Sequence, residues 1–209
     1  MAIIHRTTLK PTKLELLTTW LPTRPWYEGG AGAPELTKAG GFRLDDPEGE
    51  VGIEFMAAMD TSGPHPVTYL IPLTYRGAPL DGADHALVGT MEHGVLGKRW
   101  AYDGCHDPVL VTQLLALLEG RVQAQAQSIS DTPDHEVAHS YSGPTLPSTA
   151  TAADDQDGTE LRLTGSTAVL RLHRRPRPGT EAPEGSLGHL TGVWELPDGT
   201  RTRAPFATL

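Results

Sequence analysis

The sequence predicts a protein of the α+β class, with an antiparallel sheet packed against helices. Two segments carry apolar residues at the spacing of an amphipathic helix. Several shorter segments alternate apolar and polar residues, which is typical of antiparallel strands with one face on the core. The chain also contains 23 glycines and 18 prolines among its 209 residues, which indicates many turns and few long helices.

The first predicted helix begins after Thr12. Thr12 and Glu15 form a Thr-x-x-Glu capping box, in which each side chain can accept a hydrogen bond from the other residue's backbone N–H. An apolar series at helical spacing follows, formed by Leu14, Leu17, Trp20 and Leu21. Pro22 then ends the helix, because it has no backbone N–H to donate.

Four strands are predicted between this helix and the next. Residues 51–56 are mostly apolar, and residues 67–75 have an alternating pattern. Pro72 lies in the second of these segments and lacks a backbone donor, which favours an edge strand or a bulge. Residues 85–91 and 95–102 are expected to pair across a turn near residue 94, so the predicted sheet is antiparallel.

The second predicted helix has the clearest signals. Asp107 is a favoured N-cap residue, and Pro108 stands at the first helical position, where a missing N–H breaks no helical hydrogen bond. One apolar face follows, formed by Val111, Leu114, Leu115 and Leu118. Gly120 ends this helix.

The chain becomes polar and low in complexity beyond residue 121. Residues 142–158 are rich in Ser, Thr, Pro, Ala and Asp, and they are predicted to be a linker or a mobile loop. Short strands are expected after them, at 160–163, 168–173, 190–195 and 202–208. We therefore predict a main α+β domain at 1–140, a polar linker at 141–157 and a small β subdomain at 158–209.

Composition and charge disfavour several classes of function. The formal net charge is −9, so the field of the protein repels nucleic acid unless basic residues gather on one face. No segment approaches the roughly 18 consecutive apolar residues of a membrane-spanning helix, and the N-terminus lacks the apolar core of a signal peptide. Cys105 has no second cysteine to pair with. We expect a cytoplasmic protein with neither a nucleic-acid nor a membrane partner.

The segment from His135 to His139 matches the HExxH motif. On a helix, this spacing would place His135 and His139 on one face for zinc, with Glu136 beside the metal-bound water. The match lies between Pro133 and Gly143 in the most polar part of the chain, where no apolar face could bury a helix. We expect a solvated polar turn there, no zinc site and no other cofactor, and keep a zinc hydrolase as an alternative function.

Two further motifs are incomplete. Gly89 and Gly94 have the spacing of a phosphate-binding loop, but apolar residues follow where Lys and Ser or Thr must reach phosphate and magnesium. Cys105 could form a thiolate pair with His106, because a neighbouring imidazolium lowers the pKa of a thiol. Adjacent residues seldom point at one another, so we expect Cys105 to be an inert thiol that is either packed or partly exposed.

An aromatic cluster follows the first helix, although only 6% of the residues are aromatic. Arg24, Trp26 and Tyr27 are a candidate surface for binding a protein partner, because Trp, Tyr and Arg dominate the binding energy of many interfaces. In the alternative interpretation, Trp20 and Trp26 close the end of the core. We expect the core position for Trp20, and both interpretations stay open for Trp26.

The first 120 residues or so resemble the N-terminal cap domain of actinobacterial maltokinases and related sugar kinases. The resemblance rests on the string Trp-Leu-Pro-x-Arg-x-Trp-Tyr at 20–27, although its order differs from the family's around Pro25. It also rests on the residues that open the second helix, namely Asp103, Gly104, His106, Asp107 and Pro108. The resemblance implies a cap-like α+β domain and a setting in α-glucan, maltose or trehalose metabolism.

Residues 165–179 resemble the first strands of the nucleotide lobe of the same kinases. Arg171 stands where that family has a lysine that contacts the phosphates of ATP, and Arg174 and Arg175 follow it. The resemblance implies that the small β subdomain is similar to the start of a kinase small lobe. A weak phosphate-binding role for Arg171, Arg174 and Arg175, in a nucleotide or phosphosugar binding module, is a second alternative function.

Catalysis of phosphoryl transfer by these 209 residues alone is not expected. This chemistry needs a catalytic Asp together with an Asn and an Asp that hold magnesium, and the sequence contains no Asn. The chain also ends at about the point where the hinge and catalytic lobe of the family would begin. We therefore expect a non-catalytic accessory or regulatory protein that binds a protein partner in sugar metabolism through Arg24, Trp26 and Tyr27.

Overall fold

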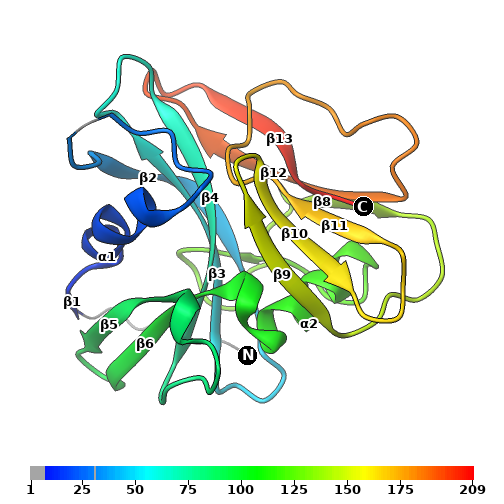
Figure 1. The fold of residues 1–209 in the computed structure, drawn as a ribbon, viewed down its shortest axis with the longest axis horizontal. Coiled ribbons are helices and arrows are strands. Elements are labelled where there is room, and N and C mark those ends of the chain that lie inside the picture. Colours follow the sequence, from blue (N-terminus) through cyan, green and yellow to red (C-terminus); the bar gives the residue numbers. More distant parts are fainter. Residues whose placement is uncertain (1–7, 31) are drawn as a thin grey trace.

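A computed structural model describes residues 8–30 and 32–209 and shows a mostly antiparallel sheet with two short α-helices (Figure 1). The helices are α1 (Lys13–Trp20) and α2 (Pro108–Leu118), with short 3-10 turns η1 (Leu21–Thr23), η2 (Asp84–Ala86) and η3 (Gly104–His106). Within the described residues the strands are β1 (Leu9–Lys10), β2 (Leu36–Leu44), β3 (Gly52–Asp60), β4 (Val67–Arg76), β5 (Leu87–His93), β6 (Gly97–Asp103), β7 (Gln125–Ala126), β8 (Ala138–Tyr141), β9 (Ala150–Asp155), β10 (Gly158–Leu163), β11 (Val169–Leu172), β12 (Gly188–Glu195) and β13 (Arg201–Thr208).

Both helices begin where their capping residues predict. Thr12 accepts a hydrogen bond from the Glu15 N–H, and the Glu15 carboxylate accepts one from the Thr12 N–H at 2.7 Å, which completes the capping box. Asp107 accepts a hydrogen bond from the Val109 N–H at 3.0 Å and has Pro108 directly after it. These starts depend on local hydrogen bonds, and the sequence prediction for them is confirmed.

Strands β3 and β4 form the centre of the sheet and are buried on both faces. Even-numbered Met56 of β3 packs with α1 and Ile71 of β4, whereas odd-numbered Phe55 packs with α2 and Leu70. Successive side chains of a strand point to opposite faces, so a strand covered by helices on both sides needs an almost continuous apolar run. This explains why residues 52–60 carry so few polar side chains.

The prediction of an edge position for the strand that contains Pro72 is wrong. β4 lies between β3 and β6 in the strand order β1-β5-β6-β4-β3-β2-β12-β13-β11-β10-β9. The N–H of Leu70 donates to the Arg174 carbonyl rather than to β3, so the nitrogen of Pro72, two residues on, also faces away from β3. The β6 ladder begins only at Leu73, and the missing donor therefore breaks no strand pairing.

Strand β2 was not predicted, because it contains two adjacent glycines near its centre, and glycine disfavours a strand. A bulge between Lys38 and Gly40 lets β2 pair with β3 on one side and with β12 on the other. Gly41 has a φ of +125°, and a Cβ there would lie 2.0 Å from the Phe55 carbonyl oxygen. Only glycine fits this position. The remaining paired segments, 85–91 with 95–102, form the expected antiparallel hairpin β5–β6.

The strands after residue 138 share a core with the first half of the chain. Leu161, Leu170 and Phe206 belong to the same buried cluster as Phe42 of β2 and Leu114 of α2. The expectation of a loop throughout 142–158 is wrong for β9, whose residues pair along the whole length of β10. The Ala and Asp residues of β9 do not favour a strand by themselves. The backbone hydrogen bonds to β10 stabilise β9 as a strand. The division into domains stays a prediction.

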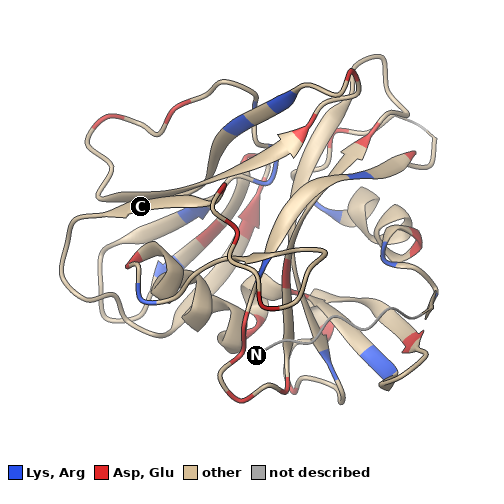
Figure 2. Ribbon diagram, turned by 180° about the vertical axis from the view of Figure 1, so that it is seen from behind, with Lys and Arg blue, Asp and Glu red and all other residues tan. Residues whose placement is uncertain are grey.

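In the ribbon of Figure 2, the positions of Lys and Arg and those of Asp and Glu are distributed over many strands and loops. Within the part of the chain that the structure describes, no helix is long and apolar enough to cross a membrane.

Candidate functional site

The predicted partner surface is only partly at the surface. Trp26 has no exposed area, and its ring lies 5.8 Å from that of Trp20 and 6.0 Å from that of Tyr69. Arg24 is half-buried over the Trp20 ring, and the Tyr27 hydroxyl donates to Asp60 at 2.9 Å. The surface hypothesis is therefore wrong for Trp26, because the turn after α1 directs this ring between α1 and the sheet.

The three predicted phosphate-binding arginines all have acidic or backbone partners. Arg171 donates to both oxygens of Asp155 at 2.9 Å and to Glu160. Arg175 forms an ion pair with Glu28 and donates to a backbone carbonyl. Arg174 is fully buried, so the phosphate-binding hypothesis is wrong for this residue. Side chains alternate along β11 and its continuation, and this alternation turns Arg174 to the inside.

Arg174 and Asp103 form a buried ion pair that joins two distant parts of the chain. Nη2 of Arg174 lies 2.8 and 2.6 Å from the two Asp103 oxygens, and its Nε donates to Thr159 at 2.7 Å. The guanidinium also lies 5.0 Å from the centre of the Trp26 ring. Burial by itself would lower the pKa of Arg174, but the neighbouring negative charges, that of Asp103 first, together with the hydrogen bond to Asp103 outweigh burial and raise the pKa above its ordinary value.

Cys105 lies next to this ion pair. Its side chain is buried, and Sγ lies 3.2 Å from Nη2 of Arg174. Burial raises the pKa of the Cys105 thiol well above its ordinary value, although the charge of Arg174 opposes the shift. A thiol that stays protonated is a poor nucleophile. The packed position of Cys105 is confirmed, and its inertness stays a prediction.

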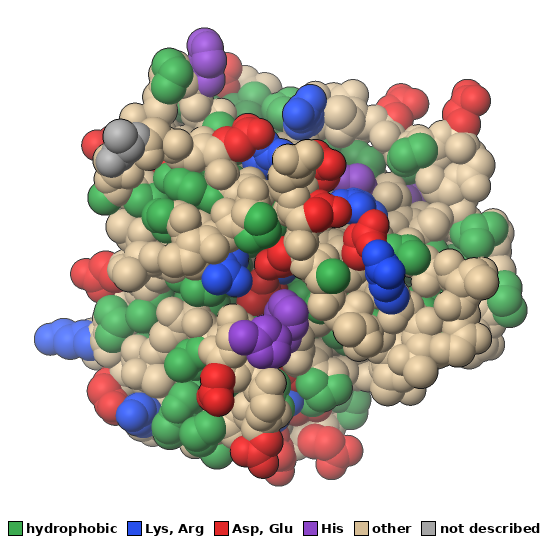
Figure 3. All heavy atoms as spheres, in the orientation of Figure 1, with side chains coloured by type: hydrophobic (Ala, Val, Ile, Leu, Met, Phe, Trp, Pro, Cys, Tyr) green, Lys and Arg blue, Asp and Glu red, His purple; other side chains and the backbone are tan. Residues whose placement is uncertain are grey.

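A cluster of possible metal ligands lies beside the ion pair. One ligand atom from each of Asp103, His106 and Asp154 lies within 4.8 Å of the others. Nε2 of His85 is 3.1 Å from Nδ1 of His106, and the two rings are nearly perpendicular. Figure 3 shows histidine side chains beside acidic side chains near the middle of this face. Burial lowers the pKa of His106, although Asp103 opposes the shift.

Sequence reasoning did not bring these four residues together. Asp103 was noted as part of a family signature, and His106 was noted both there and as a possible partner of Cys105. The spacing Asp-x-x-His at 103–106, across a 3-10 turn, was the one available local signal. His85 and Asp154 come from η2 and β9, and only the tertiary structure places them beside it.

The HExxH match does not have the geometry of a zinc protease. His139 lies in strand β8 and is paired with Leu190 of β12, so the motif is not helical. Glu136 is exposed and forms an ion pair with Arg201. The expected absence of a helix is confirmed, although residues 138–141 form a strand rather than a turn.

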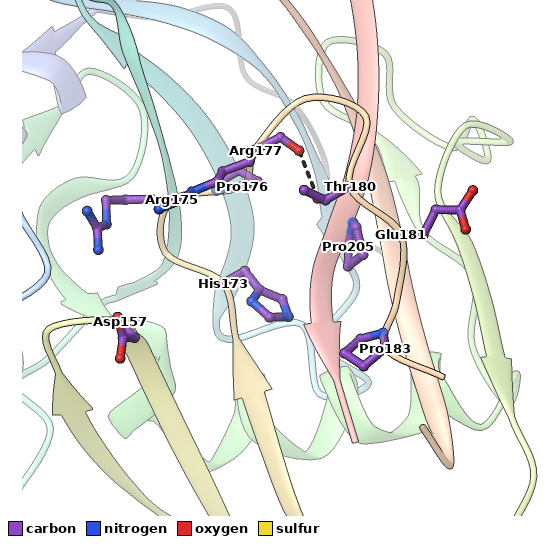
Figure 4. A pocket seen from close by; sticks show the side chains of 9 residues that line it. All are labelled: Asp157, His173, Arg175, Pro176, Arg177, Thr180, Glu181, Pro183 and Pro205. Atoms are coloured by element: carbon purple, nitrogen blue, oxygen red, sulfur yellow. Dashed lines mark hydrogen bonds between the residues drawn. The ribbon is translucent and has the colours of Figure 1, made fainter. Parts of the chain in front are cut away.

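A separate pocket of about 230 Å³ lies between the segment that follows β11, strand β13 and the turn between β9 and β10. In Figure 4 the ring of His173 points into it toward Pro183 and Pro205, whereas Arg175 points away. His173 Nε2 lies 3.0 Å from the hydroxyl of Thr208. Burial lowers the pKa of His173, and the charge of Arg171 lowers it further.

His173 is expected to make the folded protein less stable at acidic pH. Because the pKa of folded His173 is lowered, the unfolded chain binds more protons than the folded chain as the pH falls below about 6.5. The free energy of unfolding should therefore decrease between pH 7 and pH 5, and His173→Gln should make this decrease smaller. Urea unfolding of the wild type and of His173→Gln at several pH values measures this free energy. The exposed His65→Gln serves as control, and equal slopes in wild type and His173→Gln would contradict the prediction.

Comparison with known families finds a match within the first half of the chain. Residues 20–107 match the model of the maltokinase N-terminal cap domain. These residues form a maltokinase cap-like domain. The match begins at the end of α1 and runs through β2–β6 to the N-cap of α2, so the resemblance found in the sequence is confirmed. No curated protein matches the chain.

The cap-like domain supplies one side of the charged site. His85, Asp103 and His106 lie inside it, whereas Asp154 and Arg174 come from the residues that follow. The match covers less than half of the chain, and the resemblance of residues 165–179 to a kinase small lobe stays a prediction.

Proposed function

We propose that this chain is a non-catalytic accessory or regulatory protein of α-glucan, maltose or trehalose metabolism, which acts by binding a protein partner. The maltokinase cap-like domain carries the proposal, because it places residues 20–107 in a maltokinase-related setting. A domain named as the N-terminal cap of a kinase is a module beside a catalytic unit, and it favours a supporting function over chemistry of its own.

The described side chains support a non-catalytic function. Arg174 is held by Asp103, and Arg171 by Asp155 and Glu160, so these guanidinium groups are already neutralised. Phosphoryl transfer of the protein-kinase type also uses an Asn ligand for magnesium, and these 209 residues contain no Asn. The HExxH match is in a strand and turn, so it favours no zinc hydrolase.

The surface around Arg24 is the part of the predicted partner site that remains at the surface. Pro22, Thr23 and Pro25 are exposed on either side of the half-buried Arg24. Thr23 donates to the Trp20 carbonyl at 2.6 Å, and Nε of Arg24 donates to Thr23 at 3.0 Å. These bonds hold the turn in one shape. A surface that is ordered before binding loses less conformational entropy on association.

Capture of partners from the native cell tests this function. The tagged full chain should retain an identified protein of sugar metabolism, and Arg24→Glu should weaken its binding by about 30-fold, a hot-spot effect of about 2 kcal/mol. Arg203→Glu, which changes an exposed arginine of β13, should bind as the wild type does. Melting temperatures of both variants should stay close to that of the wild type.

Three results would count against the proposal. Unchanged capture by a folded Arg24→Glu variant would remove this surface, and a partner unrelated to sugar metabolism would remove the metabolic setting. Sugar-dependent release of ADP from ATP by the pure chain would show that the protein is a catalyst.

A further inference from the structure

The donor atoms near the Asp103–Arg174 ion pair are spaced for one bound ion. Zinc bonds to imidazole nitrogen and carboxylate oxygen are about 2.0–2.2 Å long, so two ligand atoms on one tetrahedral ion lie about 3.3 Å apart. The ligand atoms of Asp103, His106 and Asp154 lie within 4.8 Å of one another. Small side-chain rotations therefore suffice to bring all three onto a common ion.

His85 offers a fourth donor. Its Nε2 is 3.1 Å from Nδ1 of His106, close to the separation of two nitrogen ligands on a shared ion. His85 is exposed and lies outside the group of three whose ligand atoms are within 4.8 Å of one another, whereas His106 is half-buried. An exposed ring can move toward an ion without disturbing the core.

The charges of the cluster also favour a cation. Asp103 and Asp154 together carry two negative charges. The buried Arg174 forms an ion pair with Asp103 and balances one of these charges. Nη2 of Arg174 donates to both oxygens of Asp103, and the Cys105 N–H also donates to Oδ1, so Oδ2 is the oxygen that keeps a lone pair for an ion. Thr159 donates its hydroxyl to Asp154 at 2.5 Å, which orients that carboxylate as partners of metal ligands commonly do.

We propose that Asp103, His106 and Asp154, together with His85, bind a divalent transition-metal ion, with zinc as the representative. Mixed carboxylate and imidazole ligands suit zinc and its neighbours, whereas magnesium and calcium select oxygen ligands. The ion links the cap-like domain, which supplies three of the ligands, to β9, which supplies Asp154. Zinc therefore stabilises the folded chain, because this site requires the two parts to be in contact.

Zinc binding by the full chain tests the site. We expect a stoichiometry of about one zinc per chain in elemental analysis after gel filtration, and a melting temperature that rises with zinc concentration. Asp154→Asn keeps the side-chain volume and His85→Ala changes an exposed residue, so both should fold. Each should weaken zinc binding at least about tenfold, the lower end of what loss of a supporting group costs. A melting curve without zinc shows whether each variant is folded.

His135→Ala and His139→Ala are the matched controls, because they remove histidines of the HExxH match and leave the cluster intact. Both should bind zinc as the wild type does. The inference fails if the folded wild-type chain binds no zinc, or if folded Asp154→Asn and His85→Ala bind it as tightly as the wild type. Loss of binding in the two control variants would also overturn it, because it would move the metal to the HExxH match.

Discussion

Replacement of Arg174 by methionine should lower the free energy of unfolding by about 3–5 kcal/mol. The guanidinium is fully buried against Asp103, which is 1% exposed, so the substitution leaves a carboxylate in the interior without a counter-charge. For a chain of this size, each kcal/mol corresponds to about 2–4 °C in melting temperature, so a fall of roughly 10 °C is expected. Urea unfolding and thermal melting measure both quantities.

Two further variants separate the ion pair from a general effect of losing arginine. Arg162→Met removes an exposed partner of Glu160, and such pairs contribute at most about 1 kcal/mol. Asp103→Asn combined with Arg174→Met removes both charges and should recover part of the lost stability. If Arg174→Met is no more damaging than Arg162→Met, the buried pair does not contribute as we argue.

Trp26→Ala should also destabilise the chain by about 3–5 kcal/mol, the usual cost of removing a core aromatic side chain. Trp26 has no exposed area and packs with Trp20, Tyr69 and the guanidinium of Arg174. The cavity that its removal leaves lies between α1 and the sheet, where neighbouring rings have little freedom to close it. Denaturant unfolding gives the free energy directly.

Trp100→Ala is the control for this substitution. Trp100 is half-buried at the edge of a small cluster, with the Lys98 ammonium 5.0 Å from its ring centre, so its loss should be clearly milder. A Trp26→Ala variant with an unchanged melting temperature would place Trp26 at the surface and restore it as a candidate for partner binding.

Features that depend on neighbours in the sequence were predictable. The capping box at Thr12 and the Asp107–Pro108 start of α2 rely on hydrogen bonds within one turn, and both form as expected. The β5–β6 hairpin joins adjacent segments, so its pairing also followed from the local pattern. The string at 20–27 and the residues that open α2 indicated the resemblance to the cap domain, and the family match at residues 20–107 confirms it.

Features that depend on distant residues were not. β2 contains Gly40 and Gly41, which disfavour a strand by themselves, and it forms because β3 and β12 approach it from either side. β9 is a strand because β10 pairs with it. Pro72 was expected at an edge, but the direction of its nitrogen, which decides whether a ladder bond is lost, depends on the surrounding strands.

The same division holds for the candidate site. The sequence by itself determined the antiparallel sheet with packed helices, the two helix starts and the resemblance to the cap domain. Only the tertiary structure decided that Arg174 and Trp26 are interior residues and that His85, His106 and Asp154 meet beside Asp103. The physical reason is that burial and ligand spacing are set by which faces pack together. Arg174 pairs with a carboxylate 71 residues away, and no local pattern specifies such a contact.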